Sequence, residues 1–153
     1  MAFPLFHGSF GEDGCIQGLF EIYQIPYIGF DVGSSAAGMD KALSKAIFQA
    51  LNLPVGKFVE IKRIDWLQNF KHCLKEIKDS LKFPLFVKPG TIGSSIGVNK
   101  AKNEDELSFY IEVAAVYSNK ILVEEAFEGV IEVNCSALGY EEVQASVCEM
   151  PVA

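Results

Sequence analysis

The clearest chemical signal in the sequence is a lysine at the end of an apolar strand, followed by a loop of glycine and serine. Segment 86–98 reads Phe-Val-Lys-Pro-Gly-Thr-Ile-Gly-Ser-Ser-Ile-Gly-Val, with Lys88 where the predicted strand ends. Glycine lets the backbone approach a ligand closely and adopt positive φ, so that N–H groups can surround a phosphate. The spacing is not that of a Walker A motif, and no helix follows at once. The segment predicts a phosphate-binding loop; the alternative is an ordinary hairpin loop.

A second lysine, Lys41, stands in the first turn of a predicted helix whose N-cap is Asp40. A positive charge at that end of a helix opposes the helix dipole unless something offsets it. Together with Lys88 it predicts a pair of ammonium groups that face one anionic site and bind a polyphosphate. The alternative is a solvated lysine balanced by Asp40.

Two further groups of side chains are candidates for substrate binding. His7 and Glu12 belong to a glycine-rich loop that leads into a predicted helix, a place where an anion can bind or a substrate can be oriented. Glu124, Glu125 and Phe127 lie where a predicted strand ends, and carboxylates there can bind a ribose or a metal ion. The alternatives are a structural histidine and solvated acids on an edge strand.

Composition and charge limit the function classes. The 153 residues carry a net charge of −7, yet residues 41–102 hold 12 Lys and Arg against 4 acids. This balance argues against nucleic acid as a general partner and is consistent with a local anionic ligand. No apolar run is long enough to span a membrane, and the N-terminal residues do not resemble an export signal. We expect a cytoplasmic protein without a membrane partner.

The four cysteines show neither CxxC spacing nor a histidine cluster beside them. Zinc-finger and disulfide-framework patterns are therefore absent from the sequence. We expect buried free thiols.

Strands and helices are expected to alternate so that the candidate residues fall at their ends. Strands are predicted at 2–6, 57–61, 85–88 and 121–124 and from 96, helices at 15–23, 41–51, 65–81 and 103–117, and a hairpin at 132–147. The helix at 103–117 begins with a capping box. In the helix at 65–81, the expected buried stripe is Leu67, Phe70, Leu74, Ile77 and Leu81.

Taken together, these motifs resemble those of the D-alanine–D-alanine ligases, ATP-grasp enzymes of peptidoglycan synthesis. The matching segments, in chain order, are His7-Gly8, 11–14, 17–18, 25–29, Met39-Asp40-Lys41, 53–55, Val87-Lys88-Pro89, 93–98 and Val123-Glu124-Glu125. They cover nearly the whole chain. The resemblance implies an α/β (α+β) fold with a remnant of an N-terminal substrate-binding domain at 1–40, a central ATP-grasp subdomain at 41–128 and the beginning of a C-terminal ATP-grasp subdomain at 129–153.

The resemblance also implies roles for individual residues. Lys41 and Lys88 would contact the phosphates of ATP, with Gly93 and Ser95 in the loop that closes over them. Ser94 would act in catalysis beside the first D-alanine, and His7 and Glu12 would line the amino-acid pocket. The adenine and ribose would be bound by Glu124, Glu125, Ala126, Phe127 and Glu132. Segment 129–132 carries one residue more than the commonest family pattern, and this affects the assignment of Glu132.

The implied reaction joins two D-alanines through an acyl-phosphate at the expense of ATP, with Mg²⁺ as the metal ion. Alternatives are a D-alanine–D-lactate or D-serine ligase, a non-catalytic nucleotide-binding module and an inert folding unit. Family members begin with a further strand and helix, and they continue into an ω-loop, a catalytic arginine and the magnesium ligands. We therefore expect no metal ligands before Ala153, and we expect a central fragment of a homodimeric enzyme that has no ligase activity on its own.

Overall fold

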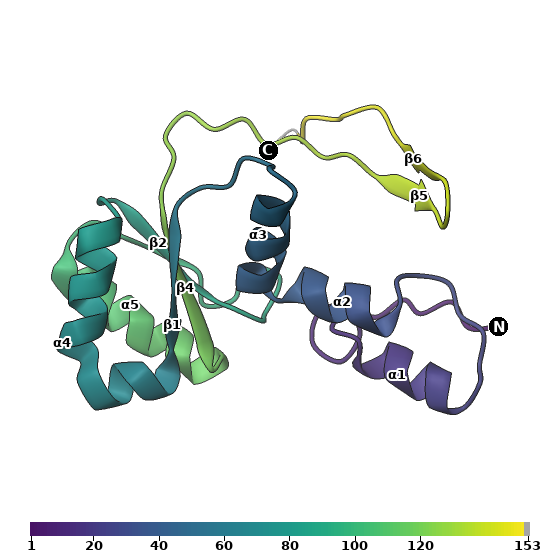
Figure 1. Ribbon diagram of the computed structural model, residues 1–153, viewed down its shortest axis with the longest axis horizontal. Coiled ribbons are helices and arrows are strands. Elements are labelled where there is room, and N and C mark those ends of the chain that lie inside the picture. The colour runs from purple at the N-terminus through teal and green to yellow at the C-terminus, as the bar shows by residue number, and fades with distance from the viewer. Residues whose placement is uncertain (152–153) are drawn as a thin grey trace.

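A computed structural model describes residues 1–151 of the chain (Figure 1). Its helices are α1 (Cys15–Ile22), α2 (Val32–Met39), α3 (Lys41–Ala50), α4 (Arg63–Ser80) and α5 (Glu104–Tyr117). Its strands are β1 (Phe58–Lys62), β2 (Leu85–Pro89), β3 (Asn99–Ala101), β4 (Lys120–Glu125), β5 (Ala137–Gly139) and β6 (Val143–Ala145). The predicted order of elements between 57 and 125 is confirmed, and so is the mixed helix and sheet fold. None of the helices within 1–151 is both long and apolar enough to cross a membrane.

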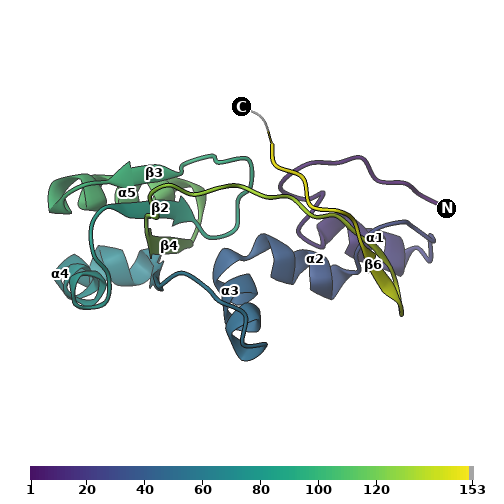
Figure 2. The same ribbon diagram turned by 90° about the horizontal axis from the view of Figure 1, so that it is seen from above.

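A four-stranded antiparallel sheet in the order β1-β4-β2-β3 positions the candidate residues. Helix α4 packs on β1 and helix α5 packs on β2, β3 and β4, so that both cover one face (Figures 1 and 2). Val87 and Val123 are fully buried in the core on that face. Because side chains alternate along a strand, Lys88 and Glu124 project from the opposite face.

The buried stripe predicted for α4 is wrong in its first part. Asn69 has non-helical backbone angles, φ −152° and ψ 64°, and interrupts the helix. Leu67 and Phe70 are consequently 72% and 49% exposed, whereas Trp66 and Cys73 are buried instead. Beyond the interruption, Leu74, Ile77 and Leu81 are buried as predicted.

Two predictions for the N-terminal part also differ from the structure. The strand predicted at 2–6 is absent: only Ala2 makes a bridge, to Tyr27, because no neighbouring strand pairs with the rest. Helix α2 was not predicted, because its sequence, rich in Gly, Ser and Ala, reads as a loop. Asp31 initiates it by accepting a hydrogen bond from the Ser34 N–H at 2.7 Å.

The prediction of buried thiols is right only for Cys73. Cys15, Cys135 and Cys148 are free but exposed. Cys15 lies at the start of α1, and the other two lie next to the β5–β6 hairpin, which is exposed throughout.

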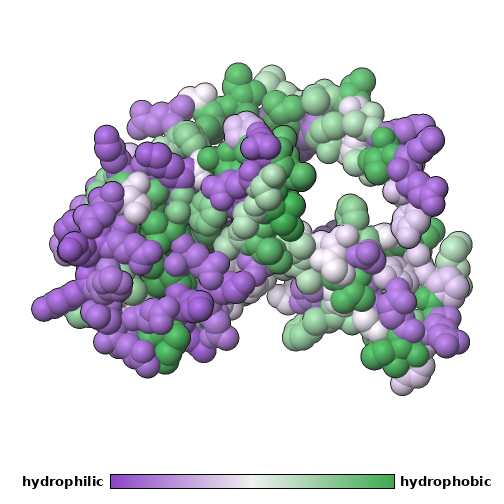
Figure 3. Space-filling view, in the orientation of Figure 1, coloured by the Kyte–Doolittle hydropathy of each residue, from purple (hydrophilic) through white to green (hydrophobic). Residues whose placement is uncertain are grey.

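Apolar side chains are exposed in several places outside the sheet and its two helices, among them Phe3, Phe30 and Leu138. Figure 3 shows hydrophilic side chains over α4, whereas green, hydrophobic atoms gather over α3 and the segment that follows β4. The well-buried core therefore belongs to β1–β4 with α4 and α5, which is the part that positions Lys88 and Glu124.

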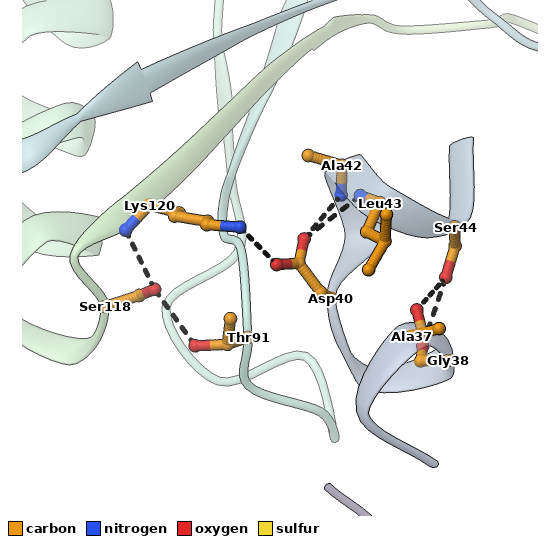
Figure 4. A network of polar contacts seen from close by, with 9 residues as sticks. All are labelled: Ala37, Gly38, Asp40, Ala42, Leu43, Ser44, Thr91, Ser118 and Lys120. Atoms are coloured by element: carbon orange, nitrogen blue, oxygen red, sulfur yellow. Dashed lines mark hydrogen bonds and ion pairs between the residues drawn. The ribbon is translucent and has the colours of Figure 1, made fainter. Parts of the chain in front are cut away.

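A polar network fixes the start of α3 against the sheet (Figure 4). Asp40 Oδ1 accepts hydrogen bonds from the Ala42 and Leu43 N–H groups, both at 3.1 Å, and thereby caps the helix as predicted. Asp40 Oδ2 accepts a hydrogen bond from the ammonium group of Lys120, the first residue of β4. Lys120 N–H in turn donates to Ser118 Oγ at 3.2 Å. The Asp40 carboxylate therefore caps the first turn of α3 and also links this helix to β4.

Gly90 completes this junction through its backbone. Its N–H donates to Lys120 O at 2.7 Å, and its carbonyl accepts from Lys41 N–H at 2.9 Å. A Cβ atom at Gly90 would lie 2.8 Å from Lys120 Cβ, which is too close. The approach of α3, β2 and β4 therefore requires glycine here.

The first prediction concerns the start of α5, where the structure confirms Asn103 as the N-cap, whereas the Glu106 carboxylate accepts from Lys102 N–H and not from the backbone N–H of Asn103. Asn103 Oδ1 accepts from Glu106 N–H at 2.9 Å, and Glu106 Oε2 accepts from Lys102 N–H at 2.8 Å. Asn103→Ala should lower the free energy of unfolding by about 1 kcal/mol, the usual contribution of an N-cap. Urea denaturation measures it, with Asn119→Ala at an exposed loop position as the control. Equal stability of both variants would contradict the assignment.

The second prediction concerns the pH dependence that Asp40 confers. Burial raises the pKa of Asp40, but hydrogen bonds from Lys120 and the α3 backbone, and the charge of Lys120, outweigh burial and lower the pKa. A carboxyl whose pKa is lowered by folding stabilises the protein above its unfolded pKa and loses this effect as pH falls.

Asp40→Asn keeps a good N-cap but removes the charge. Thermal unfolding at neutral pH and at progressively lower pH, from about pH 4 downward where aspartate titrates, should therefore show a smaller loss of stability in Asp40→Asn than in the unaltered chain. An identical loss in both would contradict the role assigned to the Asp40 carboxylate.

Candidate functional site

The centre of the candidate site is Glu124, a carboxylate on the face of the sheet opposite α4 and α5. Its Oε1 accepts a hydrogen bond from the ammonium group of Lys88 on the neighbouring strand β2. Its Oε2 lies 2.9 Å from Nζ of Lys45 on α3, at an angle that makes no hydrogen bond. The Glu124 side chain is only 13% exposed. A largely buried carboxylate thus joins α3, β2 and β4.

Lys41 belongs to the same group of charges. Burial lowers the pKa of Lys41, and repulsion from Lys88 lowers it further, against the opposing attraction of Glu124 and Asp40. The structure therefore places Lys41 close enough to Lys88 for their charges to interact, and their joint binding of one anion stays a prediction.

The balance of charge in this group favours an anion. Burial raises the pKa of Glu124, but Lys88 and Lys45 outweigh burial and lower it, so that Glu124 remains ionised. Two ammonium groups, those of Lys45 and Lys88, pair with this carboxylate, and the charge of Lys41 lies close enough to act on it. Asp40 is paired separately to Lys120. The net positive charge is suited to phosphate groups.

The glycine and serine loop lies beside these lysines. Lys41 Nζ donates to Ile92 O at 2.5 Å, which attaches the start of α3 to the loop. Ser94 and Ser95 are exposed, and both adopt left-handed angles, φ 53° and 56°. Such angles are strained for a residue other than glycine and recur at ligand-binding turns, where successive N–H groups can surround an anion.

Gly97 fixes the end of this loop. It has φ +70°, and a Cβ atom there would lie 2.9 Å from both Pro89 Cγ and Tyr117 Cδ2. Gly93, in contrast, has open space around it. The loop is therefore tightly packed where it returns to the sheet and open where Gly93, Ser94 and Ser95 were predicted to bind a ligand.

The segment predicted to receive adenine and ribose begins at Glu124, which Lys45 and Lys88 contact, and its following residues have other partners. Glu125 Oε1 accepts from Lys82 N–H at 3.1 Å, and Ala126 N–H donates to Pro84 O at 2.9 Å. The exposed ring of Phe127 packs against Gly56, where a Cβ atom would lie 2.8 Å from it. Glu132 is exposed in the connection to β5, and the structure does not bring it to Glu124.

The structure places His7 and Glu12 in a separate loop. Glu12 Oε2 accepts from Gly8 N–H at 2.6 Å and so closes this loop, whereas His7 is exposed. Ser9 and Phe10 of the same loop line a cavity of about 350 Å³ that Asp40 and Ile92 also line. The cavity therefore connects the N-terminal loop with the loop that contacts Lys41.

Sequence reasoning missed Lys45. It follows Lys41 by four residues, and side chains with this spacing lie on the same side of a helix. That spacing could have indicated that Lys45 lies beside Lys41. Its partner Glu124 on β4, however, becomes evident only once the pairing of the strands is known. Phe86 was missed too: its register places it beside Glu124, and Lys88 Nζ lies 5.4 Å from the centre of its ring.

A magnesium site is not formed by residues 1–151. No three His, Cys, Asp or Glu side chains of this part gather as metal ligands would. The residues that the structure describes fit the phosphate groups of ATP, through the lysines and the loop, but they do not fit the metal ion.

Comparison with known proteins identifies the family. The family described as D-ala D-ala ligase C-terminus matches residues 47–152, and the one described as D-ala D-ala ligase N-terminus matches residues 1–30. A D-alanine–D-alanine ligase of Bacillus velezensis is 42% identical over 146 residues, which are 95% of this chain and 41% of that protein. One of Heliobacterium modesticaldum is 44% identical over 95% of this chain and 39% of that protein. The chain thus spans about two fifths of the length of these relatives.

Solved structures agree with this assignment. The VanG D-Ala:D-Ser ligase of Enterococcus faecalis superposes with a TM-score of 0.89 at 38% identity, over 97% of this chain and 42% of that one. The D-alanine–D-alanine ligase of Helicobacter pylori superposes with a TM-score of 0.86 at 32% identity, over 97% and 44%. Since the sequence motifs, the fold and both family matches agree, the chain belongs to the D-alanine–D-alanine ligase family.

Proposed function

We propose that this chain supplies the ATP-phosphate site of a ligase that joins two D-alanines through an acyl-phosphate. The observation that carries the proposal is the pairing of Lys45 and Lys88 with Glu124, together with Lys41, which contacts the neighbouring loop of glycine and serine. The names of the relatives support the reaction. ATP as a substrate is consistent with a cytoplasmic location.

The proposed roles follow from what phosphoryl transfer needs. The reaction depends on positioning and on cancelling the negative charge of the phosphates. Lys88 and Lys41 provide positive charge, and N–H groups of Gly93, Ser94 and Ser95 close over the phosphates, with Ser94 also beside the first D-alanine. Residues 124–127 and Glu132 would bind adenine and ribose, and His7 and Glu12 would face the amino acid. Magnesium would supply further charge neutralisation, with ligands other than those at 1–151.

A D-alanine–D-serine ligase is the second candidate, because VanG carries that name and superposes closely. The two ligases differ in the product formed, so analysis of the dipeptide that a ligase of full family length containing this segment makes from D-alanine, with and without D-serine, distinguishes them. The proposals for ATP binding are the same for both.

The third prediction tests the phosphate site. Lys88→Ala should weaken binding of ATP to the chain by about 1–3 kcal/mol, roughly 5- to 150-fold, because a charge-assisted hydrogen bond is lost. Isothermal titration calorimetry measures the affinity. Lys75→Ala removes the same charge from α4, on the far side of the sheet, and should change affinity little. An equal loss of ATP affinity in both variants would mean that the loss comes from the change in net charge, and this would contradict a specific role of Lys88.

The fourth prediction uses the lowered pKa of Lys41. Because burial and Lys88 disfavour its charged form, Lys41 should lose its proton below the ordinary lysine value of about 10.4. Affinity for ATP should therefore begin to fall at a lower pH than for an ordinary lysine site. Lys41→Arg keeps its charge and should shift this fall to higher pH. Identical pH profiles for the two proteins would contradict a direct role of Lys41.

A further inference from the structure

We infer that Lys45 is a positioning residue for ATP binding: it stays paired with Glu124 when Lys88 moves to a phosphate. This inference rests on the proposed function, in which Lys88 contacts ATP. In this role Lys45 does not contact a phosphate itself but keeps the Glu124 carboxylate paired. The inference explains why Glu124 lies between Lys45 and Lys88.

The starting point is the burial of the three side chains. Glu124, Lys45 and Lys88 are 13%, 21% and 26% exposed. A buried charge is tolerated when it is paired, and it becomes strongly unfavourable when its partner is removed. Glu124 therefore needs a cation at all times, with or without a ligand.

The second step is a competition for Lys88. In the structure, the Lys88 ammonium group donates to Glu124 Oε1. A phosphate that takes this hydrogen bond withdraws part of the charge that balances Glu124. If Lys88 were the single partner of Glu124, the cost of leaving the carboxylate unpaired would be subtracted from the binding free energy of ATP.

Lys45 removes this cost because it approaches Glu124 from the other side. Its Nζ lies 2.9 Å from Oε2, the oxygen that Lys88 does not contact. The aromatic ring of Phe58, directly opposite Glu124 in the β1–β4 register, holds Lys45 Nζ 5.4 Å from its centre. Lys45 is thus placed to remain with Glu124 while Lys88 is free to move.

The neighbouring lysines are engaged elsewhere. Lys41 Nζ donates to Ile92 O, and Lys100 Nζ lies over the ring of Phe86, 5.9 Å from its centre. Within residues 1–151 the ion pairs of Glu124 are those with Lys45 and Lys88. The role of permanent counter-ion therefore falls to Lys45.

A double-mutant cycle tests the inference. ATP affinity is measured by calorimetry for the unaltered chain, Lys45→Met, Glu124→Gln and the double variant. Lys45→Met should weaken ATP binding roughly tenfold, since Lys88 must then stay with Glu124. In the Glu124→Gln background, where no carboxylate needs a counter-ion, Lys45→Met should change affinity by no more than about twofold, the limit for independent sites. Lys45→Arg should retain the affinity of the unaltered chain.

The cycle separates the competing explanations. An equal loss in both backgrounds would mean that Lys45 acts on the phosphate directly, and this would overturn the inference; so would the absence of any loss. Circular dichroism checks folding, and Lys45→Gln serves as a second neutral variant if Lys45→Met does not fold. If the unaltered chain binds no ATP, the proposed function itself fails, and the inference fails with it.

Discussion

The ion pairs of Glu124 are the interaction on which the candidate site depends. A single carboxylate on β4 attracts a lysine from the adjacent strand β2 and another from helix α3. No residue of helix α3 belongs to the main buried core, and Ala42 is its one buried residue, so the position of α3 relies largely on polar contacts. Asp40 fixes the first turn of α3 to β4, and Lys45 fixes the next turn to Glu124. Together they hold Lys41 next to Lys88.

The two faces of the sheet have different roles: one packs the apolar core, and the other holds the charged residues of the candidate site. Val87 and Val123 alternate with Lys88 and Glu124 along β2 and β4, so that the first pair packs under α4 and α5 while the second faces away. A charged group placed on the core face would have to be buried among apolar side chains, at a large cost. The face opposite α4 and α5 can hold several charges because they neutralise one another in part.

Local signals in the sequence predicted the elements and several of the site residues. The structure confirms the features that depend on near neighbours in the chain, namely the strand at Lys88, the Asp40 cap and the Asn103 cap. The interruption at Asn69 is accompanied by a local hydrogen bond, from His72 N–H to Asn69 Oδ1 at 3.3 Å. The pairing of Lys45 with Glu124, in contrast, joins residues distant in sequence. A contact between distant residues leaves no local pattern, which is why the pairing of Lys45 with Glu124 was missed. The buried stripe of α4 was wrong because Asn69 was read as part of a continuous helix. The roles of Ser94, Glu132 and His7 rest on family resemblance and stay predictions.

The most direct test is a crystal structure of the chain with a non-hydrolysable ATP analogue. The phosphate oxygens should lie within hydrogen-bond distance of the Lys41 and Lys88 ammonium groups and of the N–H groups at 93–95. Glu124 should keep its contact with Lys45. Phosphates bound elsewhere, for example at the lysines of α4, or a Lys88 that makes no contact with them, would contradict the account.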